Sequence, residues 1–161
     1  VIQEEIMFRE MRRKDKELSA REISDILAEC THGTLSVIGD NGYPYGVPVS
    51  YVYANGKIYF HCAPVGHKLD AVKKEPKVSF SVIAKDDIVP EKYGTNFASV
   101  IAFGKARVIE EVKEMKEAHI PFIEKYSKDF YDGGIKYMNS SIGKMVMVEI
   151  TVDHITGKGT R

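Results

Sequence analysis

The sequence predicts a mostly β protein of one domain, in which an antiparallel barrel carries flanking helices at its ends or across an opening. About six segments rich in β-branched and aromatic residues predict strands, and short turns join most of them. Asn55-Gly56, between two of these segments, is a strong hairpin signal. Short turns favour antiparallel neighbours over a doubly wound parallel sheet. No shift in composition divides the 161 residues, so we expect a single domain over 1–161.

The first part of the chain is expected to hold an arm, a helix and three strands. Residues 1–18 are polar and charged, which is typical of an N-terminal arm. Ser19 and Glu22 have the spacing of a capping box, and the apolar residues that follow repeat at helical spacing until Gly33. These signals predict a helix over 19–31. The three strands are predicted at 34–38, 45–53 and 57–62.

The second part is expected to alternate helices and strands. A short helix ends before Pro76, because a residue that precedes proline disfavours the helical conformation. A second helix is predicted from an apolar stripe that includes Met115, His119 and Phe122, which we interpret as core or dimer interface with His119 as a packed histidine. In order, the predicted elements are a helix at 67–74, strands at 78–83 and 99–109 with a polar loop between them, a helix at 111–126, irregular chain at 127–142, a strand at 144–152 and a tail at 153–161.

Charge and cysteine content exclude several classes of function. Lys and Arg number 23, as do Asp and Glu, and a formal net charge of zero argues against broad capture of nucleic acid or a membrane surface. Cys30 and Cys62 are too few for a disulfide framework and lack the spacing of a zinc site. His61 and Cys62 would point to opposite faces of a strand, so they cannot easily share a metal ion. Without a membrane-length apolar run or a signal-like start, we expect a cytoplasmic protein without a metal.

The segment from Ala63 to Lys68 carries a candidate anion site. A tight loop leads into a helix that opens with two potential cations, His67 and Lys68. Free N–H groups and the positive end of the helix dipole favour an anion there, and Gly66 allows a close approach. The same pattern also fits a solvated helix start with incidental charge. The residues alone leave both interpretations open.

The strand that contains Val47 to Ser50 carries a second candidate site. Proline cannot donate to a strand ladder, so Pro48 belongs on an edge strand or facing a bound group. An edge strand leaves backbone N–H and C=O groups that a flat heteroaromatic ring could use. The alternative is an edge strand protected against aggregation, and the residues do not decide between them.

Together, the two segments resemble the FMN-binding split barrels related to pyridoxamine 5'-phosphate oxidase. The resemblance covers about residues 19–109 well and the remainder more loosely. Within this family the chain is most similar to the nitroimidazole-reductase-like branch. The family motifs are Asn41-Gly42-x-Pro44, Val47-Pro48-Val49, Tyr59-Phe60-His61-Cys62 and Gly66-His67-Lys68, and those of the branch are Met11-Arg12-Arg13-Lys14-Asp15, the Gly-His-Lys turn and His154-Ile155-Thr156-Gly157-Lys158.

The resemblance implies an FMN-binding split barrel whose cofactor lies at a homodimer interface, with some contacts from the partner chain. The 47–50 strand would line the ring and ribityl chain, 61–62 would lie beside the phosphate, and 67–68 would bind it. An imidazole near the ring can move a proton at neutral pH, so His67 is the expected catalytic residue. Arg12-Arg13-Lys14 is either a solvated tail or a contact near the flavin. The positions implied to bind FMN are Val47, Pro48, Val49, Ser50, His61, Cys62, His67, Lys68 and Ser99.

Departures from the family pattern narrow the expected reaction. The vitamin B6 oxidases carry Arg at the start of the 47–52 strand and Lys at its end, where this chain has Val47 and Val52. The chain also has no Trp, so we do not expect it to oxidise pyridoxamine phosphate. We expect an oxidoreductase that reduces a nitroaromatic, nitroimidazole-like or similar small electrophile with electrons from an external donor. The alternatives are a flavin-binding carrier or sensor without turnover, and a split barrel that binds haem or a deazaflavin.

Overall fold

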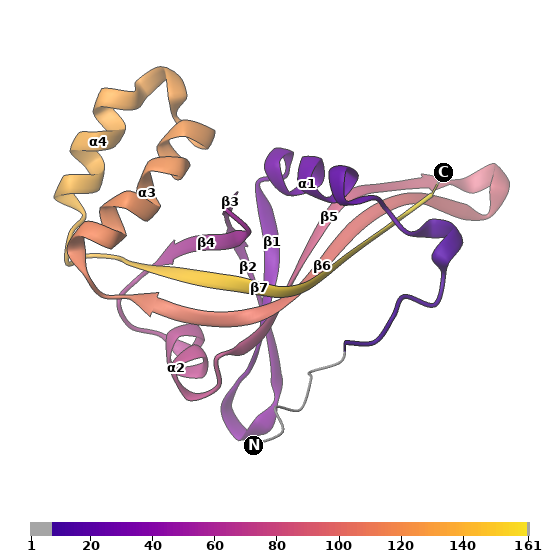
Figure 1. Cartoon of the computed structure of the whole chain (residues 1–161), viewed down its shortest axis with the longest axis horizontal. Helices are drawn as coiled ribbons and strands as arrows, with labels where there is room; N and C mark the ends of the chain where they lie inside the picture. Colours follow the sequence, from indigo (N-terminus) through magenta and orange to yellow (C-terminus); the bar gives the residue numbers. More distant parts are fainter. Residues whose placement is uncertain (1–7, 161) are drawn as a thin grey trace.

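A seven-stranded antiparallel sheet forms the body of the molecule, and the computed structural model describes residues 8–160 of it (Figure 1). Neighbouring strands follow the order β2-β1-β5-β6-β7-β4-β3. The mostly β fold with flanking helices is therefore confirmed. The strands are β1 (His32–Ile38), β2 (Pro44–Ser50), β3 (Val52–Ala54), β4 (Lys57–Cys62), β5 (Lys77–Val89), β6 (Gly94–Ile109) and β7 (Val146–Gly159).

The two edge strands of this sheet are consecutive in the chain. β2 lies at one edge and β3 at the other, and only Tyr51 separates them in sequence. Tyr51 is completely buried, and its hydroxyl donates to the carbonyl oxygen of Leu27 at 2.9 Å. The hydrogen-bonded sheet is thus not closed, and the chain itself crosses the gap at an anchored corner. The single strand predicted over 45–53 is two strands because of this corner.

Four α-helices flank the sheet in the part of the chain that the structure describes. The capping box of Ser19 and Glu22 is present at the start of α1, which ends two residues earlier than predicted. Gly33 is part of β1 and does not end the helix; a Cβ atom there would lie 2.4 Å from the Phe80 ring, so close packing requires glycine. Within residues 8–160 no helix has the length and apolar character needed to cross a membrane. The helices are α1 (Ala20–Glu29), α2 (His67–Lys74), α3 (Val112–Tyr126) and α4 (Tyr131–Ser140).

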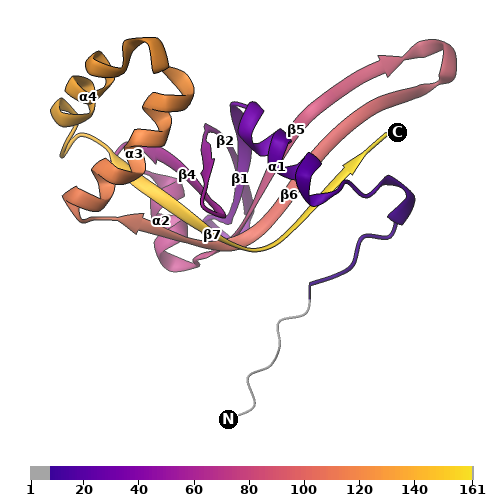
Figure 2. The ribbon, with the colours of Figure 1, turned by 45° about the horizontal axis from the view of Figure 1, so that its top comes forward.

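Helix α4 corrects the prediction of irregular chain over 127–142. Gly133 and Gly134 disfavour a helix locally, but a Cβ atom at Gly134 would lie 2.7 Å from Cγ2 of Ile123 on α3. Close packing of α3 and α4 therefore uses the glycine that weakened the prediction. The two helices form a pair at one end of the sheet (Figure 2).

The long hairpin of β5 and β6 corrects the loop predicted between these strands. After a register shift between Ile83 and Lys85, the pairing continues from Lys85 with Ala98 to Val89 with Gly94. The hairpin extends beyond the rest of the sheet in Figures 1 and 2. The C-terminal part of the chain also differs from its prediction. β7 continues through residues 153–159, for which the sequence predicts a tail.

Candidate functional site

The first turn of α2 has the geometry of an anion site. Gly66 precedes the helix with a φ of 141°, a conformation that favours glycine. In the described part of the chain no side chain caps this helix, so its first N–H groups have no side-chain partner. Burial raises the pKa of the Cys62 thiol, and the nearby charge of Lys68 partly opposes this rise. Lys68 and the end of β4 therefore lie close together, in an arrangement that suits a phosphate.

His67 is held in place by the turn between β1 and β2. Its ring stacks on Tyr45 with centroids 4.3 Å apart, and the backbone N–H of Asp40 donates to Nε2 at 3.2 Å. A neutral imidazole that accepts at Nε2 carries its hydrogen on Nδ1. The tautomer that fits this contact therefore leaves Nδ1 as the donor available to an anion.

β2 is an edge strand, as predicted from Pro48. Among the strands of residues 8–160 it pairs with β1 alone, so part of its backbone has no strand partner there. Val47 and Val49 pack against the core, whereas Pro48 and Ser50 are exposed on the outer face. A ligand on this face would reach Val47 and Val49 through their backbone groups only.

Ser99 is the one predicted contact that lies apart from the others. It is on β6, three strands from β2 in the sheet, which is roughly 14 Å at the usual strand spacing. On β6 it shares the outer face with Ile101 and Phe103, which are exposed. Within one chain the structure does not bring Ser99 to β2 and α2, so it could contribute only to the site of a second chain.

His61 and Cys62 point to opposite faces of β4, as expected. Cys62 packs against the core, and the His61 ring lies 5.7 Å from the ring of His119 and 5.3 Å from that of Phe122. Among residues 8–160 no group of His, Cys, Asp or Glu side chains is arranged to hold a metal ion.

The described part of the N-terminal arm makes contacts of its own. Arg13 pairs with Asp15 at 2.5 Å, and Lys16 lies over the Phe97 ring.

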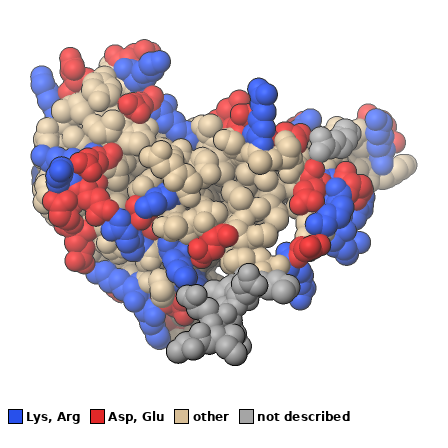
Figure 3. Space-filling model, in the orientation of Figure 1, with Lys and Arg blue, Asp and Glu red and all other residues tan. Residues whose placement is uncertain are grey.

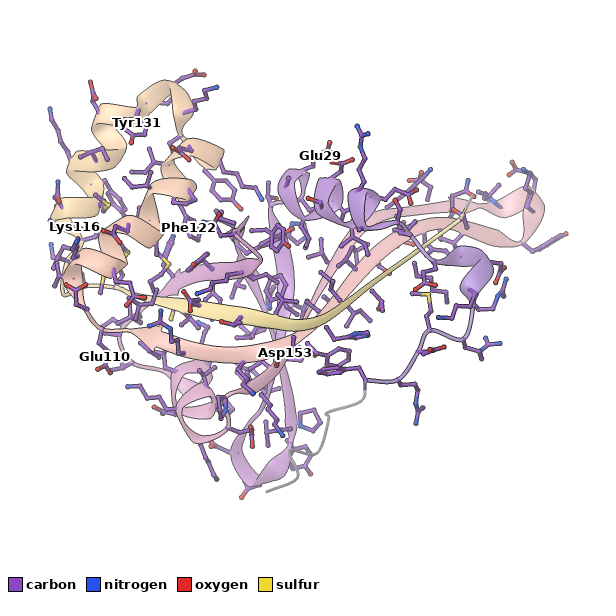
Figure 4. The ribbon with its side chains drawn as sticks, viewed as in Figure 1. Glu29, Glu110, Lys116, Phe122, Tyr131 and Asp153 are labelled. Carbon is purple, nitrogen blue, oxygen red and sulfur yellow. The ribbon has the colours of Figure 1, made fainter. Side chains whose placement is uncertain are left out.

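A pocket beside His61 is the feature that the sequence analysis missed. It measures about 460 Å³ and lies between β4, the end of β2 and the α3–α4 pair. Figure 4 labels Phe122 on α3 and Tyr131 on α4, the two helices that form its walls. In Figure 3, charged side chains gather over α3 and α4 and around the β5–β6 hairpin, while the surface between them is largely uncharged. The pocket is lined by Ser50, His61, His119, Phe122, Ile123, Tyr126, Ser127, Phe130, Gly133, Gly134 and Tyr137.

His119 is the buried polar group of this pocket. Its side chain belongs to a residue only 4% exposed, and Nδ1 has no hydrogen-bond partner in the described structure. Burial lowers the pKa of His119, and the neighbouring His61 lowers it further. Burial also lowers the pKa of His61. Both rings are therefore neutral at neutral pH. A histidine on an apolar stripe was the available signal, but it is equally typical of a core residue, as Met115 and Phe122 on the same stripe are.

The pocket is braced by contacts at the end of α3. Lys125 donates to the carbonyl oxygen of Cys30 at 2.6 Å and lies over the Tyr51 ring. The Tyr126 hydroxyl donates to the carbonyl oxygen of Tyr51 at 2.5 Å. These contacts fix α3 to the corner between β2 and β3, directly beside Ser50.

Comparison with known proteins identifies the same family as the motifs. A family model described as pyridoxamine 5'-phosphate oxidase matches residues 19–159. No curated protein matches the chain. Among solved structures, the conserved hypothetical protein Rv2991 from Mycobacterium tuberculosis is 23% identical, with 93% of this chain and 90% of that chain covered and a TM-score of 0.80.

Two further structures share this fold. A candidate 5-nitroimidazole antibiotic resistance protein from Bacteroides thetaiotaomicron is 22% identical. The match covers 88% of this chain and 85% of that chain, with a TM-score of 0.73. An FAD-binding protein from Mesorhizobium loti is 22% identical. The match covers 91% of this chain and 98% of that chain, with a TM-score of 0.64. At these identities the likeness concerns the fold.

Proposed function

The chain belongs to the pyridoxamine 5'-phosphate oxidase family, and from that premise we propose that it binds FMN and acts as an oxidoreductase. The start of α2 carries the proposal, because uncapped N–H groups, Lys68 and Nδ1 of His67 come together at one helix end. The FAD-binding protein of the same fold supports a flavin. A single anion site matches the single phosphate of FMN, which is why FMN is proposed.

The proposal gives each part of the site a separate task. Lys68 holds the phosphate as a point charge, and Nδ1 of His67 donates to it. The free backbone groups of β2 bind the polar edge of the ring, while the packing of Val47 and Val49 on the core keeps this strand in place. His61 and Cys62, at the end of β4, would lie beside the phosphate.

The proposed reaction is the reduction of a nitroaromatic, nitroimidazole-like or similar small electrophile, with a reduced nicotinamide as the external donor. A nitro group takes up two electrons and two protons and becomes a nitroso group and water. FMN supplies the electron-transfer chemistry when bound. His67 is the residue proposed to move a proton, through the imidazole nitrogen that does not bind the phosphate. The resistance protein from Bacteroides thetaiotaomicron supports this substrate class.

The proposal includes a homodimer with FMN at its interface. The outer face of β5 and β6 exposes Ile83, Ile101 and Phe103 beside Ser99, and this apolar surface would be buried by a second copy. Ser99 would then reach the site of the partner chain. Sedimentation at micromolar concentration should give a dimer, and a monomer that still holds flavin would contradict this part.

The phosphate site is tested by comparing FMN with riboflavin, which lacks the phosphate. A hydrogen bond to a charged group contributes about 1.5–3 kcal/mol, so Lys68→Ala should weaken FMN binding roughly ten- to a hundredfold. Riboflavin should change much less, because its ring contacts lie on β2. Both flavins are titrated into apo wild type and variant, and binding is followed by flavin fluorescence.

Lys74→Ala is the matched control, since Lys74 is an exposed lysine in the last turn of the same helix. Its FMN affinity should stay within about twofold of wild type, because charge effects at a helix end fall off within one turn. Equal losses of FMN and riboflavin in Lys68→Ala would mean that Lys68 supports the fold and binds no phosphate.

The class of cofactor is tested separately. The visible spectrum of the purified protein distinguishes a bound flavin from a bound haem.

A further inference from the structure

The α3–α4 pocket has the composition of a binding site for a small aromatic compound. Its volume of about 460 Å³ falls in the usual range for ligand pockets, roughly 300–1,000 Å³. Four of its lining residues carry aromatic six-membered rings: Phe122, Tyr126, Phe130 and Tyr137. Phe130 and Tyr137 are exposed, so these rings have faces free to contact a ligand. Aromatic pairs stack or meet edge to face, and a planar ring would gain such contacts here.

The lining also determines the charge of the ligand. It contains no Asp, Glu, Lys or Arg side chain, and both of its histidines are neutral at neutral pH. An ion entering the pocket would lose hydration without gaining a charged partner. The pocket therefore favours an uncharged compound.

His119 supplies an independent sign of a ligand. Roughly nine in ten buried polar groups in native proteins have a hydrogen-bond partner, and one without needs an explanation. His119 Nδ1 has none among the described residues, although the ring is stacked against His61 and close to Phe122. Nδ1 is shielded from solvent as the ring stands, so a polar group on a planar ligand would become its partner when the imidazole turns about its Cβ–Cγ bond.

We propose that this pocket binds an uncharged planar aromatic compound, with a polar substituent hydrogen-bonded to His119 once its imidazole turns Nδ1 toward the pocket. Ser50 and His61 belong both to the pocket lining and to the residues proposed to contact FMN. The pocket thus adjoins the proposed flavin face, and its occupant is the electrophile that the proposed function reduces. This last assignment rests on the proposed function, whereas the binding of the compound does not.

The test uses two probes of nearly equal shape, neutral 4-nitrobenzamide and anionic 4-nitrobenzoate. Binding to the full-length chain is measured by calorimetry at pH 7.5, with and without FMN. The expected result is binding of 4-nitrobenzamide and at least about tenfold weaker binding of 4-nitrobenzoate, because the lining holds no cation. Equal binding of both probes, or of neither, would overturn the proposal.

The role of His119 is tested with His119→Phe, which keeps a ring of similar shape and removes the polar atoms. It should lose about three- to tenfold in affinity for 4-nitrobenzamide, the effect of one neutral hydrogen bond. Binding should also shift the ¹⁵N resonance of His119 Nδ1 in the wild type. Unchanged affinity in a folded variant would contradict the assigned contact, and the wild-type resonance gives the answer should the variant not fold.

The FMN arm separates this proposal from the proposed function. 4-Nitrobenzamide binding to a protein that takes up no FMN would leave the pocket assignment intact and contradict the flavoprotein. FMN binding without 4-nitrobenzamide binding would do the reverse. Competition between FMN and 4-nitrobenzamide for one place would show that the pocket holds the flavin ring itself, and the assignment would fall.

Discussion

Two buried polar groups of opposite kinds lie at α3, Glu149 on the neighbouring strand β7 and His119 on the helix itself. Beneath its first turns, Glu149 is 4% exposed and accepts from Arg107 at 2.9 Å and from Tyr59 at 3.1 Å, while Lys57 lies 3.2 Å away. At the middle of α3 itself, His119 is equally buried, and Nδ1 has no partner in the described structure. The two groups thus differ in that the fold supplies partners for Glu149 and none, among the described residues, for His119 Nδ1.

The difference distinguishes a structural group from a functional one. Burial alone would raise the pKa of Glu149, but hydrogen bonds from Arg107, Lys57 and Tyr59 outweigh it and hold the pKa below its ordinary value. Its partners therefore explain why the carboxylate is there. Nothing within the described chain does the same for His119, which is why we assign it to the proposed ligand.

The largest expected effect is the loss of the Glu149 carboxylate. Glu149→Gln leaves Arg107 and Lys57 without their shared charge, and breaking a buried pair costs about 3–5 kcal/mol. Both cations are partly exposed and can regain water, so we expect a smaller cost, about 2–3 kcal/mol. Urea unfolding at pH 7 measures the change in the free energy of unfolding.

Glu114→Gln is the matched control, because Glu114 also pairs with Arg107 but is far more exposed. Its cost should stay below about 1 kcal/mol, as for other surface ion pairs. Equal losses in the two variants would remove the distinction between the buried carboxylate and its exposed neighbour.

The Glu149 network should also appear in the acid limb of stability. Since the folded pKa of Glu149 is lowered, its contribution is complete above the unfolded value of about 4.3 and is lost as the pH falls through the folded pKa. The difference between wild type and Glu149→Gln should therefore shrink below about pH 4.3, by at most about 1.4 kcal/mol per pH unit. Urea midpoints at pH 7, 5, 4 and 3 follow it; a constant difference would mean that another group sets the acid limb.

Local chemistry explains which elements could be predicted from the sequence. The Asn55-Gly56 turn and α2 are both determined by residues next to them in sequence. Asn55 and Gly56 have positive φ, as their turn requires, and α2 has its predicted bounds of 67–74. Helix α4 and the outer half of the β5–β6 hairpin were missed, since they depend on contacts such as that of Gly134 with Ile123, which no local pattern encodes.

The candidate site divides in the same way. The edge position of Pro48 follows from the missing N–H of proline, and the uncapped start of α2 follows from Gly66. The contact of His61 with His119 joins residues 58 positions apart (119 minus 61), and it depends on how α3 lies against β4. A sequence pattern gives no information about that placement.

The smallest expected effect on stability is that of His119→Phe, although His119 is as buried as Glu149. The substitution removes an unpartnered polar group, and the adjoining pocket gives room for the larger ring. We expect the free energy of unfolding at pH 7.5 to stay within about 1 kcal/mol of wild type, with any change toward greater stability. Because the folded pKa of His119 is lowered, the unfolded chain takes up a proton that the native wild type refuses below about pH 6.5. Wild-type stability should therefore fall relative to His119→Phe between pH 7.5 and 5.5 in urea unfolding. A loss of 2 kcal/mol or more at pH 7.5 would place His119 with Glu149, as a group that the fold itself requires.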